Sequence, residues 1–182
     1  MSDNRFPHVF PAKEAHISIP SSNKFDLASF ALLFIAVLML AFGHHPISGD
    51  SMYPTYHDGQ QVVTMRPIIG PIKMGDIVIA KSPNGYLIIK RVAATPGDTL
   101  VIQNDGSVTV NGEEYPYGKG SELVSDGFWG MAKQDDGSYS ITLGKGQYYL
   151  LGDNRENSSD SRVYGPFKRS SIWEKVVLVY GK

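Results

Sequence analysis

The sequence predicts a mainly β protein, in which an antiparallel β-sheet domain follows one N-terminal transmembrane helix. From Gln61 onward, short runs rich in β-branched residues alternate with Gly and Pro turns, and no helical period lasts three turns. Near the N-terminus, the segment from Leu27 to Phe42 is apolar and carries no charge. A chain of 182 residues suits one domain with an appendage. Many short strands favour a sandwich or a partly closed barrel.

The first 24 residues contain three prolines and no sustained period, which predicts a flexible tail. Residues 25–43 are expected to form the single transmembrane helix. The 16 uncharged residues within that range would rise about 24 Å, a little less than the roughly 30 Å of a hydrocarbon core. A cleaved signal peptide and a buried core helix are the alternative interpretations of the same segment.

Basic residues favour one orientation of this span. Arg5, Lys13 and Lys24 precede it, and no Lys or Arg follows until Arg66. Because basic residues near a span prefer the cytoplasmic side, we expect a cytoplasmic tail over residues 1–24. Residues 44–182 are then an extracytoplasmic domain, and the lipid bilayer is an expected partner.

The predicted strands are bounded by recognisable turn residues. Two hairpins are expected around the turns 82–85 and 104–106, and a third around 133–139. Further strands are expected at 147–151 and 175–180. The formal net charge of -1 does not favour nucleic-acid binding, and the absence of cysteine excludes disulfides and thiolate chemistry.

Three segments carry polar residues that sheet packing does not require. Ser51 precedes a turn proline, Lys90 ends an apolar run, and residues 152–165 form a polar loop. Taken singly, the serine suits an ordinary turn hydroxyl and the lysine a solvated strand end. The polar loop alone suits either a surface turn or a calcium-type loop. Taken together, they suit nucleophilic catalysis, because a buried neutral lysine can take the proton of a serine hydroxyl.

The segments resemble the signature boxes of the type I signal peptidase family, the membrane-bound serine/lysine endopeptidases that remove signal peptides from exported proteins. The matching stretches, in chain order, are Ser51-Met-Tyr-Pro-Thr55, Gly75-Asp-Ile-Val78, Lys90-Arg-Val-Ala-Ala-Thr-Pro-Gly-Asp98 and Gly152 through Arg162. The resemblance covers residues 25 to 182. The short stretch from 113 to 146 resembles the compact Gram-positive form.

The resemblance implies a role for each matching residue. Ser51 would be the nucleophile, Lys90 the general base and Ser158 the residue that orients the lysine amine. The implied supporting residues are Asp160, Arg162, Asp153 and Arg155. The oxyanion would rest on the backbone N–H of Ser51, with help from Gly49, and Ile47, Met52 and Ile89 would shape shallow pockets for an Ala-x-Ala cleavage sequence. The implied partners are preproteins that bear signal peptides, and no cofactor is implied.

Two other functions remain open at this stage. Self-cleaving repressors share the serine, the Gly-Asp-Ile-Val strand and the Lys-Arg pair, but they lack an apolar span and carry a DNA-binding module. A noncatalytic membrane-anchored assembly factor or chaperone, for surface structures such as pili, is the alternative from another class. Ala94 stands where the family usually has glycine. His44, His45 and His57 have no partners at metal-ligand spacing, so no metal site is expected.

Overall fold

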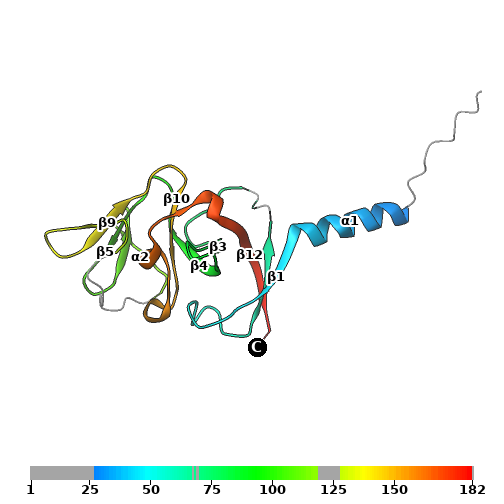
Figure 1. Ribbon diagram of the computed structural model, residues 1–182, viewed down its shortest axis with the longest axis horizontal. Coiled ribbons are helices and arrows are strands. Elements are labelled where there is room, and N and C mark those ends of the chain that lie inside the picture. The colour runs from blue at the N-terminus through cyan, green and yellow to red at the C-terminus, as the bar shows by residue number, and fades with distance from the viewer. Residues whose placement is uncertain (1–26, 67, 69, 119–127, 182) are drawn as a thin grey trace, which may run out of the picture.

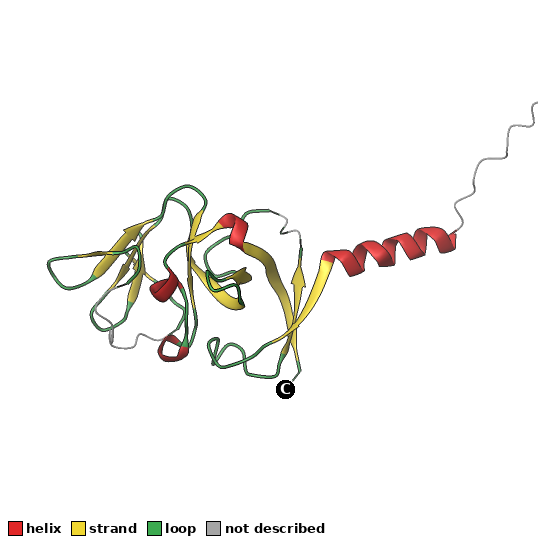
Figure 2. Cartoon of the chain, viewed as in Figure 1, coloured by secondary structure: helices red, strands yellow, loops and turns green. Residues whose placement is uncertain are grey.

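The computed structural model describes residues 27–66, 68, 70–118 and 128–181. Two antiparallel sheets lie side by side, and helix α1 (Leu27–Ala41) projects away from them (Figure 1). Strands dominate the described chain outside α1 (Figure 2). The mainly β antiparallel architecture expected from the sequence is confirmed.

The larger sheet has seven strands, which come from both ends of the domain. Their order is β1 (Phe42–Pro46), β2 (Gln61–Met65), β12 (Ile172–Tyr180), β3 (Ile77–Lys81), β4 (Leu87–Ala94), β10 (Gln147–Leu151) and β11 (Phe167–Lys168). Two short helical turns, η1 (Arg155–Asn157) and η2 (Arg169–Ser171), and helix α2 (Ser161–Tyr164) connect its last strands. This sheet carries the segments that the sequence singled out.

The smaller sheet has five strands. Their order is β7 (Glu113–Glu114), β6 (Val108–Val110), β5 (Thr99–Ile102), β9 (Tyr139–Thr142) and β8 (Ala132–Lys133). The turns at 82–85 and 104–106 join β3 to β4 and β5 to β6, as predicted. The third predicted hairpin is β8–β9. Asn or Asp followed by a flexible glycine allows the backbone to reverse at each of these turns.

The structure changes the expected end of the N-terminal helix. Phe42 and Gly43, predicted as the last helical residues, begin β1 and pair with Met65 and Thr64 of β2. The sheet offers this stretch a ladder of backbone hydrogen bonds, which replaces the helical ones. No residue of α1 is buried against the sheets. Among the described residues, no helix meets the length and apolarity needed to cross a membrane. The predicted tail, residues 1–24, lies outside the described residues.

The hydrophobic core is divided into three clusters. One joins the two sheets and includes Leu100 and Ile102 of β5 with Tyr149 and Leu151 of β10. A second lies beneath α2 and β11. The third packs Met52 against strands β2, β3 and β12. Because this third cluster holds the residue next to Ser51, core packing fixes the position of the serine loop.

Candidate active site

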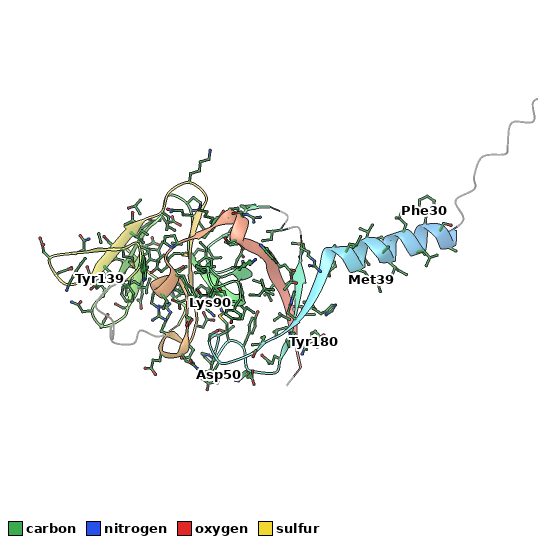
Figure 3. The ribbon with its side chains drawn as sticks, in the orientation of Figure 1. Phe30, Met39, Asp50, Lys90, Tyr139 and Tyr180 are labelled. Carbon is green, nitrogen blue, oxygen red and sulfur yellow. The ribbon has the colours of Figure 1, made fainter. Side chains whose placement is uncertain are left out.

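The centre of the larger sheet brings Ser51 and Lys90 into contact. Lys90 lies on β4, paired with Val78 of β3, and its side chain is 3% exposed (Figure 3). Its Nζ atom donates a hydrogen bond to Ser51 Oγ at 2.7 Å and another to the Ile89 carbonyl at 2.8 Å. Thirty-nine positions separate the two residues in the chain, so the fold, and not local sequence, creates this pair.

Burial makes Lys90 a weaker base than an ordinary lysine. Desolvation is the largest cause and lowers its pKa to about 8, since the ammonium form loses hydration inside the protein. Asp160 and Asp153 oppose this change, whereas Arg162 adds to it. About one amine in ten is therefore neutral at pH 7, far more than for an ordinary lysine, and a neutral amine can accept the Ser51 proton.

The loop after β10 contacts the backbone of Ser51 and holds it in place. The Asn154 N–H donates to the Ser51 carbonyl at 3.0 Å. A Cβ atom on Gly152 would lie 2.6 Å from that same carbonyl oxygen and 2.2 Å from Ser158 Oγ. Only a residue without a side chain fits between the two segments. The glycine at the start of the polar loop is therefore explained by close approach.

Asp160 lies at the centre of the hydrogen bonds within the polar loop. Its fully buried carboxylate accepts from Arg162 Nε at 2.9 Å and from the Gly152 N–H at 3.0 Å. It also caps α2. The Ser158 hydroxyl is buried near Gly152, yet it has no hydrogen-bond partner among the described residues. The contact between Ser158 and Lys90 that would orient the amine is thus not present in this structure.

Asp153 pairs with a residue for which the sequence suggested no role. Arg91, the neighbour of Lys90, donates to Asp153 Oδ2 at 2.6 Å. The Thr55 hydroxyl donates to the same oxygen at 2.5 Å. Arg155 instead donates to the carbonyls of Gly152 and Tyr117. The adjacency of Arg91 to Lys90 was visible in the sequence, but its partner lies 62 positions away.

The predicted oxyanion donors differ in their availability. The Gly49 N–H donates to Asp58 Oδ1 at 2.7 Å in this structure, so it must exchange that partner before it can serve an oxyanion. Gly49 has a φ of +84°, which suits glycine. The backbone N–H of Ser51 remains the expected donor.

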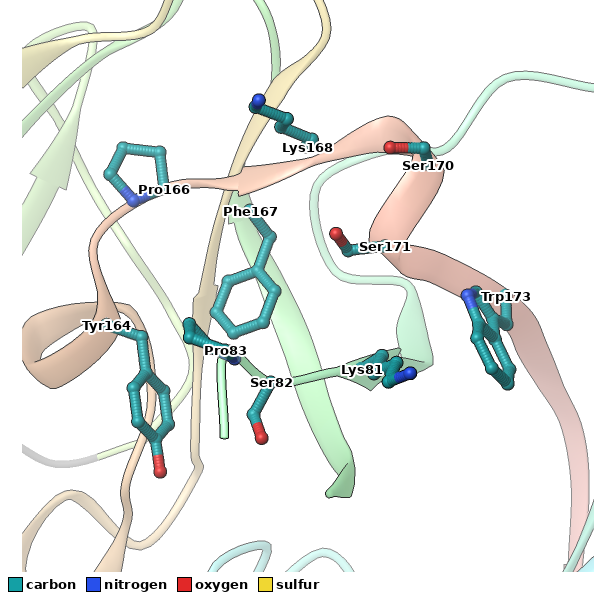
Figure 4. Close-up of a pocket in the computed structure, with 10 residues that line it drawn as sticks. All are labelled: Lys81, Ser82, Pro83, Tyr164, Pro166, Phe167, Lys168, Ser170, Ser171 and Trp173. Carbon is teal, nitrogen blue, oxygen red and sulfur yellow. The ribbon is translucent and has the colours of Figure 1, made fainter. Parts of the chain in front are cut away.

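A cavity of about 210 Å³ opens beside the reactive pair. Ser51 and Lys90 line it together with Ile47 and Ile89, two of the predicted pocket residues. Met52 does not line it, because its side chain is fully buried in the core. A larger hollow between the β3–β4 turn and β11 contains neither reactive residue (Figure 4).

This arrangement can carry out the chemistry of a serine hydrolase. The hydroxyl can attack a carbonyl, the amine can take its proton, and the cavity can hold a short peptide next to both groups. The described residues contain no group of three His, Asp or Glu side chains placed to hold a metal ion.

Comparison with known proteins defines the family. The family model "Signal peptidase, peptidase S26" matches residues 24–181. The chain is 30% identical over 161 residues to signal peptidase I of Bacillus amyloliquefaciens, covering 84% of this chain and 82% of the relative. It is 31% identical to signal peptidase IB of Staphylococcus aureus (strain N315), covering 81% and 82%. A solved signal peptidase I from Enterococcus faecalis V583 shows 27% identity and a TM-score of 0.43, covering 61% of this chain and all of that one.

The chain therefore belongs to the signal peptidase family, peptidase S26. It is accordingly an enzyme, a serine peptidase of the hydrolase class.

Proposed function

We propose that this protein is a membrane-bound endopeptidase that removes N-terminal signal peptides from exported preproteins, with Ser51 as nucleophile and Lys90 as general base. The observation that carries the proposal is the 2.7 Å hydrogen bond between a buried amine of lowered pKa and the serine hydroxyl. The family supplies the substrate class.

In this mechanism, Lys90 takes the hydroxyl proton as Ser51 Oγ attacks the carbonyl of the scissile bond. The backbone N–H of Ser51 then stabilises the oxyanion, a contribution of about 3 kcal/mol per donor. The resulting ammonium of Lys90 protonates the leaving amine, and the neutral amine next activates the water that hydrolyses the acyl-enzyme.

An exposed strand edge suits the extended substrate. Along Leu87–Lys90, β4 pairs with β3 on one side, and its pairing with β10 begins only at Arg91. A peptide that adds to this free edge would run past the cavity toward Ser51. The shallow cavity, bounded by Ile47 and Ile89, suits the small side chains of an Ala-x-Ala sequence.

Helix α1 is proposed as the membrane anchor, with residues 1–24 in the cytoplasm and the sheets outside it. Its 15 residues carry no charge, and none of them is buried by the rest of the chain. Such a surface is unfavourable in water at about 25 cal/mol per Å² of apolar area, so lipid is its expected cover.

Cleavage of a preprotein with an Ala-x-Ala site by the detergent-solubilised full chain tests this function. We expect the wild type to cleave at that site, and Ser51→Ala and Lys90→Ala each to abolish cleavage. Ser170→Ala and Lys145→Ala are matched controls, because both side chains are exposed, and these variants should keep full activity. A folded wild type that cleaves none of several such preproteins would favour the assembly-factor alternative.

A further inference from the structure

A buried carboxylate outside the catalytic segments contacts a residue that lines the cavity. Glu174 of β12 is 3% exposed, and its oxygens accept hydrogen bonds from the Thr64 hydroxyl and from His45 Nε2, the latter at 2.7 Å. Arg66 pairs with it at 3.2 Å. Side chains from three neighbouring strands, β1, β2 and β12, thus meet at the Glu174 carboxylate.

The backbone of β1 makes room for this carboxylate. A Cβ atom on Gly43 would lie 2.9 Å from Glu174 Oε2, 2.7 Å from Thr64 Oγ1 and 3.1 Å from His45 Nε2. Any other residue at position 43 would therefore displace the cluster. The absence of a side chain lets Glu174 reach His45 across β2.

The ring that Glu174 holds also lines the catalytic cavity. His45 lines the same cavity as Ser51 and Lys90. It lies six positions before Ser51, and Leu87, another lining residue, lies three positions before Lys90. Both segments run toward the reactive pair, so we infer that His45 and Leu87 lie at the end of the cavity away from it, about 10 Å along β4.

The spacing of an extended peptide identifies which substrate side chain reaches that end. Alternate side chains of a strand point the same way and lie about 7 Å apart. If the residue whose carbonyl is attacked lies at Ser51, the residue two positions before it projects toward the same wall at His45. The residue between them points away.

We propose that His45, oriented by Glu174, determines specificity by favouring a small hydroxyl side chain, threonine or serine, two positions before the residue at which Ser51 attacks. This inference rests on the proposed peptidase function and extends it to the substrate sequence.

The chemistry of the ring selects a hydroxyl group. Glu174 as a carboxylate only accepts hydrogen bonds, so Nε2 of His45 carries the hydrogen between them. The other nitrogen, Nδ1, accepts a hydrogen bond when the ring is neutral and donates one when it is protonated. A hydroxyl group can do both, whereas the methyl of valine, which has nearly the same shape as threonine, can do neither.

The test compares two peptides that are identical except for threonine or valine at this position, cleaved by the full chain in detergent. We expect the wild type to show a kcat/KM about fivefold higher for the threonine peptide. In His45→Leu the ratio should fall to about one. His44→Leu is the matched control: its side chain is exposed and alternates to the other face of β1, so this variant should keep the wild-type ratio.

Glu174→Gln gives a second readout, because loss of the charged acceptor releases the ring and should lower the ratio. A purely structural role of the cluster would instead slow both peptides equally. A wild-type ratio of threonine to valine kcat/KM near one, or a ratio that persists in His45→Leu, overturns the inference. The wild-type ratio alone is decisive even if a variant fails to fold. Failure to cleave either peptide overturns the peptidase function itself, whereas Ser51-dependent cleavage without preference overturns only the role of His45.

Discussion

At the scale of single residues, the proposed mechanism makes the rate depend on the protonation of Lys90. The amine must be neutral to accept the Ser51 proton, and its pKa of about 8 places the change within an accessible range. We expect kcat/KM to fall about tenfold for each pH unit below 8 and to level off above it. Single-turnover cleavage across this range measures the profile. A rate that does not change with pH would contradict Lys90 as the base.

The same burial predicts a conflict between stability and activity at this residue. Because folding lowers the Lys90 pKa, the unfolded chain binds more protons between pH about 8 and the ordinary lysine pKa of 10.5, so stability rises with pH over that window. The free-energy cost of burying the charged Lys90 amine is fully present below pH 8. Lys90→Met should therefore be inactive yet more stable at pH 7. Removing the cost of burying the charge should exceed the loss of two hydrogen bonds by about 1–2 kcal/mol.

Denaturant unfolding of both proteins at pH 7 and above pH 10 measures this difference. The advantage of Lys90→Met should shrink as the pH rises, because the amine of the wild type is then neutral in both states. An advantage that stays constant with pH would show that packing, and not desolvation, causes it.

At the scale of elements, the contact between the serine loop and the loop after β10 depends on Gly152. In Gly152→Ala, the new methyl group would meet backbone at 2.6 Å and Ser158 at 2.2 Å. We expect the loop to shift and activity to fall at least 100-fold, with a destabilisation of about 1–3 kcal/mol typical of overpacking. Activity and the denaturation midpoint measure the two effects.

Gly144→Ala provides the matched control. Its new methyl group meets only the end of the flexible Gln147 side chain, at 3.1 Å, and should leave activity within about twofold of the wild type. Equal losses in the two variants would mean that the close approach at Gly152 is not what positions Ser51.

The elements show what the sequence could predict and what it could not. Alternating apolar residues and glycine turns predicted β3–β4, β5–β6 and β8–β9, because these hairpins are local. The boundary at Phe42 could not be predicted, since an apolar phenylalanine suits a helix or a strand until β2 is known to lie beside it. Met52 was expected in a pocket and lies in the core, because apolarity alone does not distinguish the two.

In the candidate site too, features carried by local motifs were predicted, whereas contacts between distant segments were not. The Ser51 and Lys90 pair was inferred because both residues stand in motifs with distinctive neighbours. The partners Arg91 and Asp153, and the cluster around Glu174, depend on contacts between distant strands. Charge types alone gave no means of pairing them.

At the scale of the whole molecule, the proposed anchor α1 would keep the peptidase at the membrane. Ile35→Arg places a charge near the middle of the apolar helix and should weaken membrane association by about 2.5–3.5 kcal/mol. Ala28→Arg, near the helix end, should have a smaller effect, because the side chain can extend to the interface. Flotation with lipid vesicles measures both variants. Equal retention of Ile35→Arg and wild type would contradict insertion of α1.

The junction between α1 and β1 leaves only a short connection between the helix and Ser51. The helix ends at Ala41, β1 begins at the next residue, and ten positions separate Ala41 from Ser51. If α1 lies in the bilayer as proposed, the five residues of β1, which span about 17 Å, connect the membrane to the serine loop and limit how far Ser51 lies from the lipid. We then expect the protein to select bonds by depth as well as by sequence: a bond level with Ser51 should be cut, and the same sequence held one helical turn deeper should be spared.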